Sequence, residues 1–167
     1  LIGAAQLTAT AVVTLLLAAR AARPGRVRMA RIGVVLTAFG ALWVGLADDP
    51  VTLLLTNVVL GAGLGVVYAA ATAALAAVED SGKASAVAVA GTVAIAALLI
   101  VAVPIANEHW AGAGFFVLAA CCAPAWFLVA RLPESPVVTE SGRPGRPSVV
   151  LLLGTAALWT ITQGTWA

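Results

Sequence analysis

Long apolar runs make up most of this chain, and only short polar or charged stretches interrupt them. The runs are rich in Ala, Leu, Val and Gly and lack a two-residue alternation, which favours helices over barrel strands. Runs of about 16 to 28 residues can cross a hydrocarbon core of roughly 30 Å at 1.5 Å per residue. The pattern therefore predicts an all-α membrane protein, a polytopic helical bundle. Its six expected transmembrane spans are Leu1–Ala19, Ile32–Ala47, Val51–Val78, Ala84–Ala106, Ala111–Ala130 and Val149–Ala167.

The distribution of charge predicts the orientation of these spans. All basic residues fall after the first, third and fifth spans, at Arg20, Arg23, Arg26, Arg28, Arg31, Lys83, Arg131, Arg143 and Arg146. The two intervening loops carry only Asp48, Asp49, Glu108 and His109 as ionisable groups. By the positive-inside rule, the arginine-bearing loops are expected in the cytoplasm. The prevalence of Arg over Lys, with abundant Ala and Gly, favours a bacterial inner membrane.

The composition also predicts a membrane-embedded chain. Hydrophobic residues form 62% of it and charged residues 10%, too little charge to cover a water-soluble domain. The net charge of +2 gives no reason to expect nucleic acid as a partner. Because the chain begins at Leu1 and ends inside an apolar run, we expect a piece of a longer protein.

Small residues and prolines mark expected features of the helices. Gly61 and Gly65 share one face of the third span, which predicts either a tight helix crossing or a surface along which helices slide. Pro104 and Pro124 remove backbone hydrogen bonds and are expected to kink their helices. Such a kink serves packing or acts as a hinge, and Pro104 is the candidate hinge.

Catalytic chemistry is not expected. The sequence contains no hydrolase triad motif and no cluster of metal-ligating residues, so we predict no enzyme, no metal and no cofactor. All acidic residues lie in loops or at span ends, whereas coupled transporters commonly carry a proton or cation on an intramembrane carboxylate. Asn57, Tyr68 and Gln163 are the polar groups hardest to place in lipid. They are expected to line a cavity or to hydrogen-bond between helices.

The first basic loop resembles a signature of the major facilitator superfamily, which reads Gly-x-Leu-Ala-Asp-Arg-x-Gly-Arg-Arg between that family's second and third helices. Arg23, Gly25 and Arg26 match it, while Ala18 and Ala22 stand where the signature has Gly and Asp. Other similar segments follow in family order. They are Asn57 to Gly63, Asp80 to Ser85, Pro104, Leu132 to Pro136, and Thr162 to Trp166.

The resemblance implies family helices two to seven of a twelve-helix fold. Residues 1–136 would form most of the amino-terminal half, 137–148 the cytoplasmic central loop, and 149–167 the first helix of the second half. Arg23, Gly25 and Arg26 would then belong to the cytoplasmic gate, and Asn57, Tyr68 and Gln163 to the substrate path. The family often has Arg where Asn57 stands. Coupling would use residues outside this chain, with protons as the candidate ion, or the transport would be uniport-like.

Two functions are therefore expected. The first is a secondary transporter of a small molecule, with efflux as the expected direction, working by alternating access. The second is a membrane-embedded assembly or scaffold subunit whose small-residue helices pack against partners and transport nothing.

Overall fold

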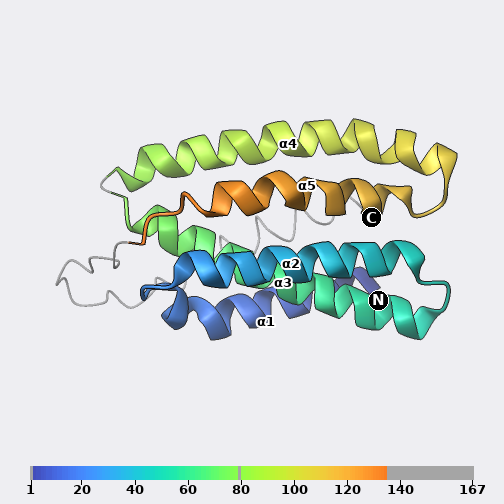
Figure 1. Ribbon diagram of the computed structural model, residues 1–167, viewed down its shortest axis with the longest axis horizontal. Helices are drawn as coiled ribbons and strands as arrows, with labels where there is room; N and C mark the ends of the chain where they lie inside the picture. Colours follow the sequence, from blue (N-terminus) through green and yellow to red (C-terminus); the bar gives the residue numbers. More distant parts are fainter. Residues whose placement is uncertain (1, 79, 135–167) are drawn as a thin grey trace, which may run out of the picture. The chain divides into compact units, whose positions relative to one another are not determined.

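A computed structural model describes residues 2–78 and 80–134 of the chain (Figure 1). The chain divides into two units, Leu1–Val137 and Val138–Ala167, and the described residues belong to the first. The central loop predicted at 137–148, the sixth span predicted at 149–167 and the candidate site residue Gln163 lie outside the described residues.

The described part is entirely helical, as the sequence predicts, and contains no strand. Its helices are α1 (Ile2–Ala21), α2 (Arg26–Leu46), α3 (Pro50–Ala76), α4 (Ser81–His109) and α5 (Ala113–Val129). The first four are long and apolar enough to cross a membrane, whereas α5 has 17 residues. Helix α4 runs on through Pro104, and α5 through Pro124, without interruption. Whether Pro104 acts as a hinge stays a prediction.

The start of the second helix differs from the sequence-based expectation. The span was predicted from Ile32, but α2 begins at Arg26 and is 21 residues long. The apolar pattern marks only the lipid-facing part, and arginine is a good helix former that extends the helix beyond it. As a consequence, Arg26, Arg28 and Arg31 lie in the first turns of α2, and Arg20 lies in the last turn of α1. Of the five arginines expected in a loop, only Arg23 lies between helices.

Helix α3 packs against α1 on one side and α2 on another, and α5 joins α2 to α4. Glycines allow the close approaches to α3. A Cβ atom on Gly63 would lie 2.5 Å from the backbone nitrogen of Thr37 in α2, and one on Gly40 would lie 2.8 Å from the Leu60 backbone. On the α1 side, a Cβ on Gly61 would collide with the Gln6 carbonyl oxygen. In lipid, such backbone proximity supplies the van der Waals contact that drives helix association.

Two threonines of α1 add polar contacts to this crossing. The hydroxyl of Thr10 lies 3.0 Å from the carbonyl oxygen of Gly61, and that of Thr14 lies 3.2 Å from the carbonyl oxygen of Gly65. Both hydroxyls are also within hydrogen-bond distance of carbonyls in their own helix. Since both pairs are four residues apart in the same order, α1 and α3 run parallel here.

The outward surface of these helices is apolar. Leu15, Leu98 and Phe127 are each 70% exposed or more, and many other large apolar side chains are exposed with them. A continuous surface of this kind is costly in water and neutral in lipid. The surface and the four long apolar helices indicate a membrane-embedded protein.

Substitution of Gly65 by Ala is expected to destabilise the protein, because the added Cβ would lie 2.7 Å from the Thr10 carbonyl oxygen. Overpacking of this kind costs about 1 to 3 kcal/mol. The matched control is Gly91→Ala in α4, where nothing lies within 4 Å of an added Cβ. Thermal unfolding of the detergent-solubilised protein should show a lower Tm for Gly65→Ala alone. Equal Tm values for the two variants would contradict the close α1–α3 contact.

Candidate functional site at the basic end of the helices

The turn between α1 and α2 has a geometry that only glycine adopts easily. Gly25 has a φ of +98°, in the left-handed region, and directly precedes α2. Arg20, at the end of α1, donates from Nη1 to the Pro24 carbonyl oxygen at 3.0 Å. This turn presents the first backbone N–H groups of α2, which have no partner within the helix.

Glu134, just beyond α5, supplies the acceptors for these N–H groups. Its Oε2 accepts from the Gly25 nitrogen at 2.7 Å, and its Oε1 accepts from the Val27 nitrogen at 2.7 Å. A carboxylate at a helix N-terminus is also favoured by the helix dipole. The hydrogen bond from Val27 and then that from Gly25 lower the pKa of Glu134 below its ordinary value of 4.5, and the charge of Arg26 adds a smaller effect in the same direction.

Arg26 completes this contact between distant segments. Its side chain is 1% exposed. Its Nε donates to the Ala21 carbonyl oxygen at 3.0 Å, and its Nη1 donates to the Pro133 carbonyl oxygen at 2.6 Å. The guanidinium therefore connects the end of α1 with the segment after α5. We call the contact of Gly25, Arg26 and Val27 with Pro133 and Glu134 the α2–α5 junction.

The predicted gate residues have different surroundings. Gly25 and Arg26 belong to the α2–α5 junction, whereas Arg23 is exposed in the turn. The signature quoted above has Asp where this chain has Ala22. Here Glu134, which is 107 residues from Val27 in the sequence, brings a carboxylate to the cluster of arginines instead. Sequence reasoning did not single out Glu134. The available signal was an acid directly after the fifth span, on the side predicted to carry the basic loop.

The predicted path residues are not brought together by the described part of the chain. Asn57 is 5% exposed and donates from Nδ2 to the Leu53 carbonyl oxygen of its own helix at 2.8 Å. Tyr68 is 59% exposed. Their separation of eleven residues places them on one side of α3, about 16 Å apart along its axis. They can therefore line one face at different depths, but they do not touch.

The opposite end of the helices has acidic and aromatic residues in place of the arginines. A cavity of about 450 Å³ lies there, lined by residues that include Asp48, Trp110 and Phe115. His109 directly precedes Trp110 in the sequence, and its Nδ1 lies 3.0 Å from the Ile105 carbonyl oxygen of its own helix. Asp49 caps α3 by accepting from the Val51 and Thr52 nitrogens. Among the residues the structure describes, no group of His, Cys, Asp and Glu side chains could hold a metal ion.

Replacement of Glu134 by Gln is expected to lower stability by about 1 kcal/mol at neutral pH, as loss of a helix cap does. The amide has only one acceptor oxygen for the two N–H donors. Glu108→Gln is the control, because Glu108 is an exposed carboxyl at the far end of α4. Thermal unfolding in detergent measures both variants.

The same contact gives a pH dependence with a defined sign. Because folding lowers the pKa of Glu134, its stabilisation is present above the ordinary value of 4.5 and is lost as pH falls through the lower folded pKa. The Tm of the unsubstituted protein should fall over this acidic range more steeply than the Tm of Glu134→Gln. Parallel pH profiles for the two proteins would rule out the ionised carboxylate as the cap.

Compared with known proteins, the chain matches no family model, no curated protein and no solved structure. A relationship to the major facilitator superfamily therefore stays a prediction from the short segments quoted from the sequence, and the functional argument rests on the geometry of the helices.

Proposed function

We propose that this chain is part of a secondary transporter that moves a small molecule across a membrane by alternating access. The observation that carries the proposal is the α2–α5 junction, which ties together helix ends more than a hundred residues apart. The two bonds that Glu134 accepts are exposed at the helix ends, where water can replace them, whereas the Arg26 side chain in the junction is buried. Exposed polar contacts can form and break during a cycle at lower cost than contacts between packed helices.

The packing supports a unit that moves as one body. Helices α1, α2 and α3 are closely packed through glycines, and α5 is attached to α2 by the junction and by a cluster that includes Ala30, Val34 and Val129. In transporters built of repeats, such units rock against each other around a site near the middle of the membrane. The bonds of Glu134 in the junction would form when the basic end of the helices closes and break when it opens.

The proposed substrate path follows the side of α3 that carries Asn57 and Tyr68; Gln163, expected from the sequence to belong to it, lies outside the described residues. The polar groups of this path suit a small molecule with both apolar and hydrogen-bonding parts, and efflux is the proposed direction. We place the coupling ion, with protons as the candidate, on residues outside this chain.

One observation favours the alternative of a scaffold subunit. From Gly82 to His109, helix α4 has no buried residue, and it contacts little besides α5. Its exposed face is rich in Ala with Gly91 among them, which suits close packing against another helix. A scaffold subunit would present such a face without any water-filled path.

Thiol accessibility in the full-length protein separates the two functions. In a background with Cys121 and Cys122 replaced by Ala, cysteines at positions 57, 68 and 163 are expected to react with a membrane-impermeant maleimide. They should do so because a transport path admits water, and position 57 should react more slowly than position 68 because Asn57 is buried. Leu55→Cys is the control, since Leu55 is exposed on the side of α3 roughly opposite Asn57 and would face lipid.

The same variants link accessibility to transport. Cells that express the full-length protein should accumulate less of at least one compound in a panel of fluorescent substrates, and that compound should slow labelling at positions 57 and 68. If none of the three cysteines reacts faster than Leu55→Cys, the path assignment is wrong. Labelling without any transported compound would favour the scaffold subunit.

A further inference from the structure

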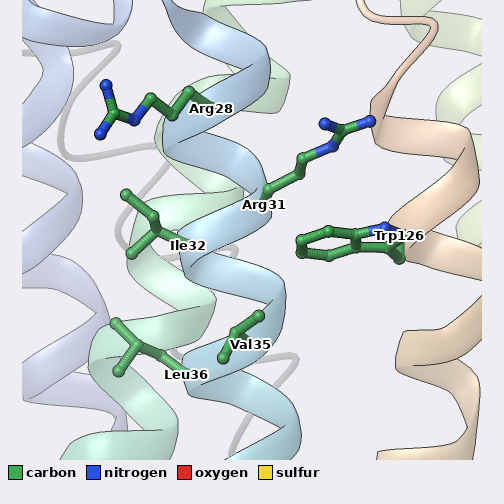
Figure 2. A pocket seen from close by; sticks show the side chains of 6 residues that line it. All are labelled: Arg28, Arg31, Ile32, Val35, Leu36 and Trp126. Atoms are coloured by element: carbon green, nitrogen blue, oxygen red, sulfur yellow. The ribbon is translucent and has the colours of Figure 1, made fainter.

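A groove beside α2 combines two arginines with an apolar wall. It has a volume of about 340 Å³ and is lined by Arg28, Arg31, Ile32, Val35, Leu36 and Trp126. Figure 2 shows the two arginines at one end of the groove, Arg28 extending away from α5 and Arg31 toward it, with the aliphatic side chains further along α2 and the Trp126 ring extending from α5 toward α2. The groove therefore has a cationic end and an apolar length.

Arg31 is held at the edge of this groove with unused hydrogen-bonding capacity. Its Cζ lies 5.1 Å from the centroid of the Trp126 ring, a distance typical of a cation–π contact. Its Nε is buried and has no hydrogen-bond acceptor within the described part of the chain. The buried Nε is closed to a ligand in the groove, so an anion would bind through the other N–H groups of this guanidinium.

The two acids that the structure describes at this end of the helices have other partners. Glu134 accepts from Gly25 and Val27, and Asp80 accepts from the Lys83 nitrogen at the start of α4. Within residues 2–78 and 80–134, no carboxylate forms an ion pair with Arg28 or Arg31. The cationic end of the groove is thus complementary to an anion from outside this part of the chain.

The apolar length of the groove identifies the kind of anion. Ile32, Val35 and Phe39 follow Arg28 and Arg31 along one side of α2, and each is more than half exposed. Arg28 and Phe39 are eleven residues apart, about 16 Å along the helix, which is close to half of a hydrocarbon core of about 30 Å. A free phosphate would use only the arginines. A phospholipid would use the whole surface, with its headgroup at the membrane boundary and its chain in one leaflet.

We propose that this groove binds one anionic phospholipid. The phosphodiester would lie over the first turns of α2, bound by Arg31 and by Arg28 once its exposed side chain turns toward the groove, and an acyl chain would lie along Ile32 and Val35 beside the Trp126 ring. Basic pockets between transmembrane helices are a known setting for acidic headgroups. Because the groove lies between α2 and α5, the lipid would connect the same two helices as the α2–α5 junction. This proposal requires a membrane-embedded protein but does not depend on transport.

Fluorescence quenching of Trp126 tests the site directly. The full-length protein, with Trp126 kept as its sole tryptophan, is placed in vesicles in which the mole fraction of brominated phosphatidylglycerol or of brominated phosphatidylcholine is raised stepwise. Half of the Trp126 quenching should be reached at a mole fraction of phosphatidylglycerol on the order of tenfold lower than that of phosphatidylcholine, as expected for two arginines near the membrane surface. The double variant Arg28→Gln/Arg31→Gln should lose this preference.

A matched variant separates a built site from general attraction. Arg23→Gln/Lys83→Gln removes two charges from the same end, and neither residue lines the groove. It should keep the phosphatidylglycerol preference. Unchanged quenching by brominated phosphatidylcholine shows that every variant still places Trp126 in the bilayer. Equal quenching by the two lipids in the protein with both arginines, or equal loss of preference in the two double variants, overturns the proposal.

Discussion

The close approach of helix backbones is the constraint on which the rest of this structure depends. In hydrocarbon, apolar side chains gain nothing by leaving lipid for another helix, so association depends on contact and on hydrogen bonds. Gly40 and Gly63 bring α2 and α3 together, and Gly61 and Gly65 bring α3 to α1. The hydroxyls of Thr10 and Thr14 then lie close enough to reach carbonyl oxygens across the crossing. The central position of α3 follows from its glycines, which face both neighbours.

Helix α5 has a different attachment, and this difference organises the basic end of the bundle. Its contact with α2 combines a small apolar cluster with charged and backbone groups just beyond the helix ends. Arg26 is buried there but keeps the carbonyl oxygens of Ala21 and Pro133 as acceptors, so its buried Nε and Nη1 donors are satisfied. A crossing made of glycines is rigid, whereas a contact made of carboxylate and backbone groups can exchange with water. The glycine crossings of α1, α2 and α3 are thus the fixed part of the bundle, and the contact between α2 and the segment after α5 is the part that can open and close.

The sequence predicted the elements better than their contacts. The length of the apolar runs was enough to predict the helical class and the five helices within the described residues, because the thickness of the hydrocarbon core sets the length of a span. It placed the start of α2 too late, because arginines at a membrane boundary continue a helix as readily as they end one. Glu134 was not predicted as a partner of Gly25 and Val27, since that pairing depends on how α2 and α5 pack. The spacing of Gly61 and Gly65 predicted a packing face, but Thr10 and Thr14 on the other helix appeared only in three dimensions.

The arginines of the first basic segment show why topology alone says too little about this end of the chain. Arg26 is buried in the α2–α5 junction, Arg20 binds the Pro24 carbonyl oxygen, and Arg31 lies over Trp126. So many positive charges within the end of α1 and the first turns of α2 repel one another and oppose the dipole of α2, so an anion nearby stabilises the fold. Glu134 is one such anion, and a lipid phosphate at Arg28 and Arg31 would be a second. Both would act on the same helix end and both would hold α5 to α2, so their effects should not be additive. The composition of the membrane and the closure of the junction would in that case be coupled through the first two turns of α2.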